Sequence, residues 1–196
     1  RTNVEKTREN LAKRREAGRF APYCQQMIWE TMRQTMGDVT MYESLLLDPD
    51  WIHDFNRVYT DFFIKHFQYL IDHAGKPDAI QIFEDLGYKN GLFCSPKTLE
   101  ELIFPYYREF VEWAHAQDLP VMLHTCGRIT DALDMIVDAG FDYLDPMERK
   151  AGCEPFEYVE RHADKLVFRG GLDARVLETH DRDTIRREVR ELIDGM

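Results

Sequence analysis

The feature that most constrains the fold is a regular alternation of short apolar runs with longer amphipathic segments. The clearest run, 121–127, lies between turn-forming residues, as expected for a strand that is buried on both faces of a parallel sheet. Strands that alternate with helices indicate a parallel α/β architecture. The expected strands are 20–27, 78–84, 121–127, 141–146 and 165–169, and the expected helices are 48–75, 95–117 with a break near Pro105, 129–139, 155–163 and 181–193.

Two parallel architectures are compatible with this alternation. A closed (β/α)8 barrel needs about eight strands and typically about 250 residues, whereas this chain has 196 residues. An open, doubly wound sheet suits the length, but no glycine-rich phosphate loop follows any of the expected strands. We therefore expect one domain over residues 1–196, an incomplete (β/α)8 TIM barrel. Because the chain starts at Arg1 and stops just after a helical pattern, we expect barrel pieces to be missing at both ends.

Charge and composition exclude several classes of partner. The formal net charge of -11 repels phosphate backbones and anionic membranes, so we expect neither nucleic acid nor membrane as a partner. No window approaches the roughly 18 consecutive apolar residues of a membrane span. The basic segment 1–19 is expected to be a solvated helix and not a targeting peptide, because acidic residues are interspersed in it. The four cysteines lack the close pairing of a disulfide framework. The sequence predicts a cytoplasmic protein.

His124 and Cys126 are the candidate metal ligands. Residues two apart in a strand point to the same face, so both side chains are expected to project from the end of their strand, where barrel enzymes place their active sites. An imidazole beside a thiolate suits Zn²⁺, which takes about four nitrogen and sulfur donors. The alternative is a cysteine packed as a small hydrophobe beside a histidine bonded to a backbone carbonyl. The position directly before Gly127 favours the metal.

Glu84 and Asp85 are the candidate catalytic residues. They close the strand 78–84, and neighbouring residues at a strand end cannot both face inward unless the chain is already turning. One of them is expected to reach the barrel mouth, where it would bind a metal or accept a proton. The alternative is that one caps the next helix or pairs with a cation.

The candidate substrate-binding residues follow the last two expected strands. Asp145 ends one of them, and Gly170, Gly171 and Asp173 follow the other. Paired glycines permit close approach of the backbone to a ligand, and a turn that needs positive φ explains them equally well. Asp173 either orients a polar group of the substrate or caps the following helix.

Several stretches, in one order along nearly the whole chain, carry a resemblance to a known family. They are Trp29 to Gly37 with Asp48-Pro49-Asp50, Phe83 to Gly87, Leu123 to Gly127, Ala139 to Asp142, and Gly170 to Ala174. With these motifs the chain resembles the uroporphyrinogen decarboxylase (URO-D) superfamily of barrel enzymes, and it is closest in motif to the branch of cobamide-dependent (corrinoid) methyltransferases.

The resemblance implies an activity and its ligands. In the methyltransferase branch His124 and Cys126 correspond to two zinc ligands, and the third would lie beyond Met196. Zinc would bind and deprotonate a substrate thiol, which would accept a methyl group from a corrinoid such as methylcobalamin; a methoxy substrate is the other option. A separate corrinoid protein and a small-molecule substrate are the expected partners, and the sequence leaves a homodimer open.

Two alternative functions remain at this stage. Uroporphyrinogen decarboxylase of porphyrin biosynthesis needs no metal, but its pattern has a serine at the position of Asp85, a tyrosine where this chain has Arg33 or Gln34, and no His-x-Cys in the later strand. A barrel that binds a corrinoid without catalysis would keep the cavity but not an intact metal site. The three departures from the decarboxylase pattern favour the methyltransferase.

Overall fold

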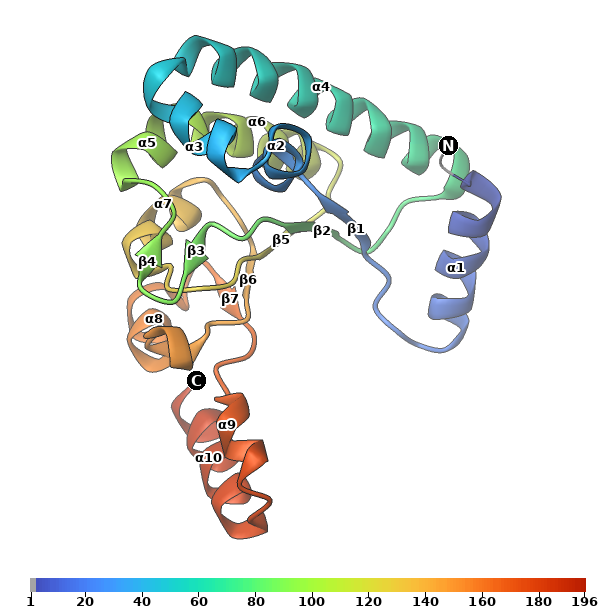
Figure 1. The fold of residues 1–196 in the computed structure, drawn as a ribbon. Coiled ribbons are helices and arrows are strands. Elements are labelled where there is room, and N and C mark those ends of the chain that lie inside the picture. The colour runs from blue at the N-terminus through green and yellow to red at the C-terminus, as the bar shows by residue number, and fades with distance from the viewer. Residues whose placement is uncertain (1–2) are drawn as a thin grey trace.

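The computed structural model describes residues 3–196 and has a main sheet of five parallel strands (Figure 1). The strand order β1-β2-β5-β6-β7 follows the chain without a reversal, as in a barrel and unlike a doubly wound sheet. The sheet is therefore part of an incomplete TIM barrel, as the sequence predicted. Its strands are β1 Tyr23–Gln26, β2 Ile80–Phe83, β5 Val121–His124, β6 Tyr143–Asp145 and β7 Val167–Phe168.

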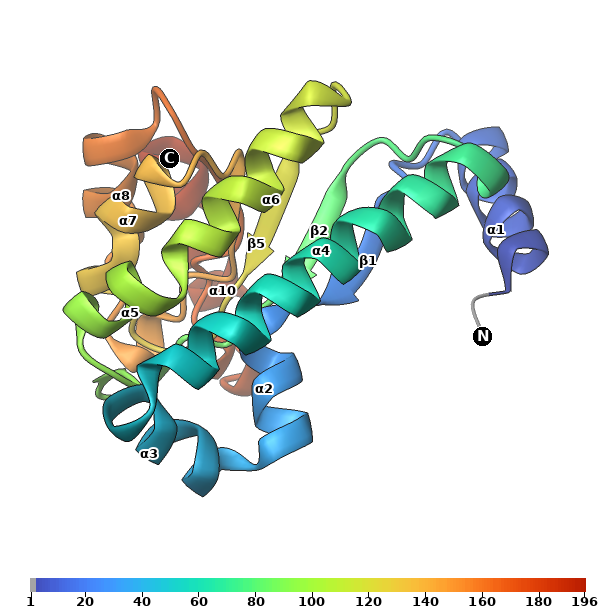
Figure 2. The ribbon, with the colours of Figure 1, turned by 90° about the horizontal axis from the view of Figure 1, so that it is seen from above.

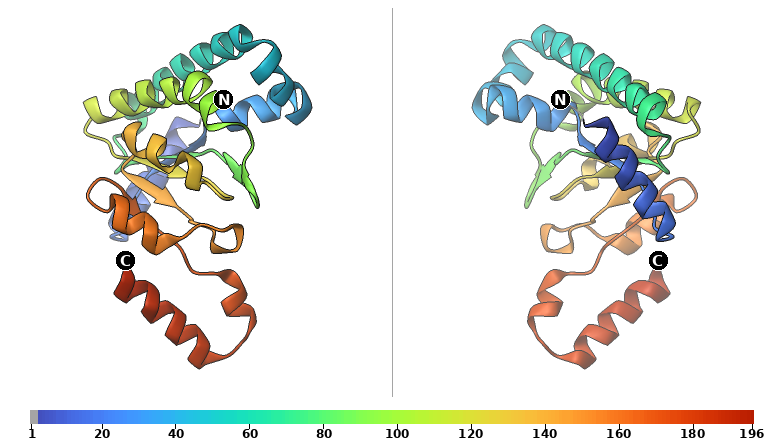
Figure 3. Two further views of the ribbon diagram at one scale, coloured as in Figure 1. Left: turned by 90° about the vertical axis from the view of Figure 1, so that its left-hand side faces the viewer. Right: turned by 90° about the vertical axis from the view of Figure 1, so that its right-hand side faces the viewer.

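Helices cover this sheet. Figure 2 shows the long helices α4 and α6 lying side by side over β1, β2 and β5, and Figure 3 shows α9 and α10 projecting beyond the sheet. The helices are α1 Val4–Glu16, α2 Ile28–Met36, α3 Asp38–Leu47, α4 Pro49–Ala74, α5 Pro96–Leu102, α6 Phe104–Ala116, α7 Leu133–Asp138, α8 Pro155–His162, α9 Ala174–Glu178 and α10 Arg182–Gly195. None of the helices within residues 3–196 is long and apolar enough to cross a membrane.

The boundaries of α4 follow from local sequence. The Asp48 side chain accepts a hydrogen bond from the Trp51 amide at 3.2 Å, and Pro49 occupies the first turn, where a missing N–H is harmless. Gly75, with φ +112°, ends the helix. The predicted helix at 48–75 is confirmed. The predicted break near Pro105 is also confirmed, since α5 and α6 are separated at Ile103.

Other parts of the structure were not expected. The sequence analysis did not identify α2, α3, α9 or the small hairpin of β3 Gly87–Tyr88 and β4 Gly91–Leu92. The predicted strand 121–127 ends at His124. The predicted helix 129–139 begins as a 3₁₀ turn, Thr130–Ala132, which precedes α7. In the expected basic helix 1–19, the structure has α1 from Val4 to Glu16, and residues 1–2 lie outside the described part of the chain.

The first turn of α2 is held by a residue from a distant strand. Glu84, fully buried after β2, accepts backbone hydrogen bonds from Met27 at 2.7 Å, Trp29 at 2.7 Å and Glu30 at 3.3 Å. The Tyr107 hydroxyl donates a fourth at 2.5 Å. Burial raises the pKa of Glu84 to about 7, although these four donors act in the opposite direction. The carboxylate supplies the cap that Met27, at the start of α2, lacks.

We predict that Glu84→Gln destabilises the fold by about 2–4 kcal/mol, because an amide NH₂ would face N–H donors and leave buried groups unpaired. Urea unfolding measures this as a lower midpoint. The matched control is Glu109→Gln on the exposed side of α6, which should change the free energy of unfolding by less than about 0.5 kcal/mol. Equal midpoints for the two variants would contradict the capping role.

Candidate metal centre

The centre is built on one row of residues across three neighbouring strands. In the register of the sheet, Phe83 of β2 is opposite His124 of β5, and His124 is opposite Asp145 of β6. All three lie at the carboxyl ends of their strands. Parallel pairing therefore brings three side chains together from positions that are 21 or more residues apart in the chain.

His124 is fixed on two sides by its row neighbours. Its Nδ1 lies 3.0 Å from a carboxylate oxygen of Asp145, and the Phe83 ring stacks on the imidazole with 4.3 Å between centroids and 11° between planes. Burial raises the pKa of Asp145, but hydrogen bonds from His124 and Arg169 outweigh it and lower the pKa overall. An ionised Asp145 accepts a hydrogen bond from Nδ1–H, and in this tautomer Nε2 presents its lone pair to the site.

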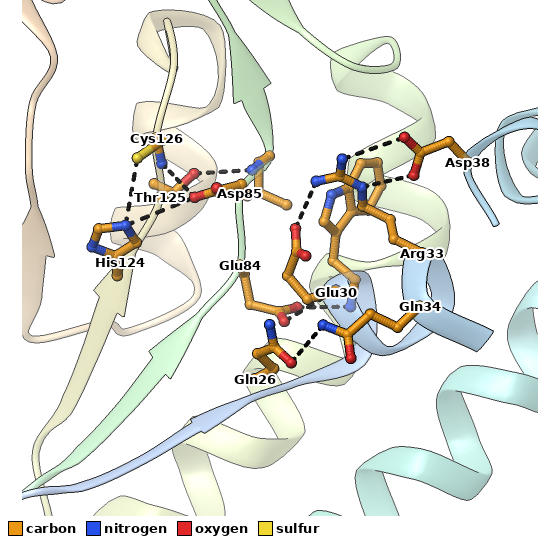
Figure 4. A network of polar contacts seen from close by, with 12 residues as sticks. Gln26, Glu30, Arg33, Gln34, Asp38, Glu84, Asp85, His124, Thr125 and Cys126 are labelled. Atoms are coloured by element: carbon orange, nitrogen blue, oxygen red, sulfur yellow. Dashed lines mark hydrogen bonds and ion pairs between the residues drawn. The ribbon is translucent and has the colours of Figure 1, made fainter. Parts of the chain in front are cut away.

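Two further donor atoms lie beside that nitrogen (Figure 4). The Cys126 sulfur is 3.5 Å from His124 Nε2, and Asp85 Oδ1 is 3.8 Å from the same nitrogen. The Cys126 amide donates to Asp85 Oδ1 at 2.8 Å, which ties the two loops together. Ligand atoms of Asp85, His124 and Cys126 all lie within 4.8 Å of one another.

These residues fit a zinc ion. With metal–ligand distances of about 2.0–2.3 Å in a tetrahedron, donor atoms are separated by roughly 3.4–3.6 Å. The observed 3.5 Å and 3.8 Å need little adjustment. The set of one nitrogen, one sulfur and one oxygen is one that Zn²⁺ accepts, and three protein donors leave a position for a substrate. A carboxylate also has lone pairs enough for both the Cys126 amide and a metal.

The surroundings of Cys126 are rich in negative charge. Burial, followed by the nearby carboxylates of Asp85 and Glu148, raises the pKa of the Cys126 thiol to about 12. Without a cation the sulfur is a protonated thiol at neutral pH. A bound divalent cation reverses this balance, because coordination favours the thiolate.

The loops that carry Asp85 and Cys126 touch backbone to backbone. A Cβ on Gly127 would lie 2.2 Å from the Gly87 carbonyl carbon, and Gly127 has φ +86°. The Leu86 amide donates to Thr125 Oγ1 at 3.0 Å, and the Arg128 amide donates to the Tyr88 carbonyl at 2.9 Å. The close contact requires glycine at position 127 and keeps Cys126 next to Asp85.

The other candidate residues have different surroundings. Glu84 points to the first turn of α2 and away from His124, so we do not include it in the site (Figure 4). A Cβ on Gly170 would lie 2.2 Å from the Pro146 carbonyl oxygen, so the close approach at this glycine is to backbone. Asp173 caps α9 by accepting from the Arg175 amide at 2.9 Å. Hydrogen bonds from Arg175 lower the pKa of Asp173 to about 2.

A pocket of about 480 Å³ opens beside Cys126. Its volume is in the range of about 300–1,000 Å³ that small-molecule sites occupy. The sequence analysis did not identify its wall, because most of it comes from the β3–β4 hairpin, the loop after β6 and α9. The lining residues are Gly87, Tyr88, Lys89, Cys126, Gly127, Glu148, Lys150, Ala151 and Arg175.

Fold and site together define a (β/α)-barrel protein with a candidate metal centre at the carboxyl ends of its strands. The chain belongs to the uroporphyrinogen decarboxylase (URO-D) family, whose model matches residues 27–196. The resemblance inferred from the motifs is thereby confirmed at the level of the family.

Structural comparison agrees on the fold. A methyltransferase from Methanosarcina mazei superposes with a TM-score of 0.65 at 17% sequence identity, over 84% of this chain and 46% of that chain. This chain thus corresponds to about half the length of that protein, and at this identity the likeness concerns the fold alone. A comparison with curated protein sequences gives no match.

We predict that Asp145→Asn weakens zinc binding by about 10- to 100-fold, because an amide no longer fixes the imidazole tautomer as an ionised carboxylate does. Competition with a chromophoric chelator measures the affinity. Asp138→Asn, at an exposed position at the end of α7, is the matched control and should leave the affinity unchanged. A variant at position 145 with unaltered affinity would show that Asp145 does not orient a ligand.

Proposed function

We propose that this chain is part of a zinc-dependent methyltransferase that moves a methyl group between a corrinoid and a small thiol or methoxy substrate. The observation that carries the proposal is the convergence of His124 Nε2, Cys126 Sγ and an Asp85 oxygen, with His124 held from behind by Asp145. The methyltransferase found by structural comparison supports this choice within the family.

The residues of the chain have distinct tasks in this proposal. His124, Cys126 and Asp85 would hold the metal. Because Asp85 supplies a third donor, this donor set does not require the third zinc ligand that was expected beyond Met196. Bound zinc would supply Lewis acidity, which stabilises a substrate thiolate or polarises an ether oxygen. Asp145 keeps the His124 lone pair directed to the metal, and Phe83 covers one face of the imidazole.

The pocket beside Cys126 accounts for substrate access. A small molecule placed there would bring its sulfur or oxygen to the metal while the rest contacts the β3–β4 hairpin and the loop after β6. The methyl-carrying corrinoid would be the second reactant, and we propose that a separate corrinoid protein presents it at the barrel mouth. Decarboxylation of a tetrapyrrole and corrinoid binding without catalysis are the alternatives, and neither requires this donor set.

Metal content separates these functions. We predict about one zinc per chain by elemental analysis of the purified protein, and its loss in Cys126→Ala, because the sulfur ligand is removed. Cys24→Ala, at an exposed cysteine of β1, is the matched control and should retain the metal. Stoichiometric zinc retained by Cys126→Ala would rule out the ligand assignment.

Activity gives the second readout. Incubation with methylcobalamin and a small thiol should yield the methyl thioether with the wild-type protein and with Cys24→Ala, and none with Cys126→Ala. Absence of zinc from the wild-type protein would instead favour the decarboxylase or the corrinoid-binding function.

A further inference from the structure

The long helix α4 carries an apolar stripe that the core of the protein does not cover. Trp51, Val58, Phe62 and Tyr69 point away from the sheet, and they are 43%, 64%, 52% and 48% exposed. Their spacings of seven, four and seven residues place them on one line along the helix, here called the outer stripe. Within residues 3–196, no helix or strand lies over this side of α4 (Figure 1).

Aromatic contacts hold the outer stripe in place. The Tyr59 ring stacks on Phe55 with 4.3 Å between centroids and lies edge-on to Phe62 at 6.4 Å, and Phe62 stacks on His66 at 5.9 Å. Rings that are already packed lose little conformational freedom when a partner binds. Aromatic side chains are enriched in protein interfaces, and exposed apolar patches mark such sites. The outer stripe therefore has the properties of a surface that binds protein.

The charges beside the outer stripe alternate in sign. Asp54, Arg57, Asp61 and Lys65 follow one another along its exposed flank, with side chains that are more than half exposed. Arg57 pairs with Asp54 at 2.9 Å and Lys65 with Asp61 at 2.6 Å, both within the helix. Although the chain has a formal net charge of -11, these four charges sum to zero. A second acidic copy of the chain would meet no net repulsion at this flank.

The order of the apolar residues is symmetric about the middle of α4. A two-fold axis level with Thr60 places Trp51 opposite Tyr69 of a second copy and Val58 opposite its Phe62, because each pair is equidistant from residue 60. The two helices then run antiparallel, and the outer stripe of one copy meets the same stripe of the other.

The charges obey the same symmetry. In an antiparallel pair related by a two-fold axis, the same flank of each helix faces the other copy. Asp54 then lies near Lys65 of the second copy, and Arg57 near its Asp61, within about two residues or 3 Å along the axis. Since packed helices are closest where they cross, these central charges dominate the contact. Acidic groups meet basic groups on both sides of the axis.

We propose that the outer stripe of α4 binds a second copy of this chain, with the two α4 helices antiparallel about an axis level with Thr60. The occupant follows from the symmetry of the stripe, which matches its apolar and its charged residues to themselves. The outer stripe lies on the side of α4 away from the strands, whereas the candidate metal centre lies at their carboxyl ends (Figure 2). The inference therefore does not depend on the proposed function.

Charge reversal tests the pairing. Sedimentation equilibrium of the wild-type protein should give the mass of a dimer, and Asp54→Lys and Lys65→Asp should each weaken the dimer about tenfold or more, because like charges would then be opposite each other. Lys165→Asp, exposed before β7, is the matched control for Lys65→Asp and should leave the dimer unchanged. The replaced side chains are exposed, so the fold is expected to tolerate both substitutions, and circular dichroism checks this.

Mixing the two variants identifies the geometry. In an equimolar mixture of Asp54→Lys with Lys65→Asp, one chain has lysine at both positions and the other has aspartate at both, so opposite charges meet again and the dimer should return. A wild-type protein that remains monomeric up to about 100 μM would overturn the inference and leave the outer stripe to a different protein segment. A dimer that neither variant weakens, or weakened variants that mixing does not rescue, would also overturn it.

Discussion

The candidate centre depends on the in-register pairing of three parallel strands. Because Phe83, His124 and Asp145 occupy one row across β2, β5 and β6, the imidazole lies between a ring that stacks on it and a carboxylate that bonds it. A slip of one residue in either pairing would turn the neighbouring side chain to the other face of the sheet and leave Nδ1 without its acceptor. The backbone ladder of the sheet therefore sets the orientation of a candidate metal ligand.

The second constraint is the packing of the loops that leave these strands. Gly127 lies against Gly87, and the Cys126 amide donates to Asp85, so the two loops are packed and hydrogen-bonded together. Glu84, one residue before Asp85, accepts hydrogen bonds from backbone amides in the first turn of α2. The two adjacent residues thus have different contacts: Glu84 bonds the backbone of α2, whereas Asp85 faces the candidate metal centre.

Local sequence was sufficient for some of this arrangement and insufficient for the rest. The alternation of apolar runs and the Asp48-Pro49 start of α4 are visible within a few residues, and the structure has both at the predicted places. The side chains of His124 and Cys126 also lie together, 3.5 Å apart, although Cys126 follows the end of β5 and is not part of the strand as predicted. The partners of these residues are not local. Glu84 caps a helix 54–57 residues away, and Asp145 bonds a histidine 21 residues away. Such contacts depend on strand register, which a single sequence does not specify.

Charge links the metal centre to the pocket beside it. Burial, followed by the nearby carboxylates of Asp85, Glu148 and Asp145, raises the pKa of the Cys126 thiol, an arrangement that is unfavourable for a thiolate unless a cation is bound. Inside the site a divalent ion would compensate these carboxylates. At the pocket wall Lys89 and Lys150 provide positive charge that the carboxylates only partly neutralise. The candidate metal centre and the pocket wall therefore differ in the sign of the charge that surrounds them.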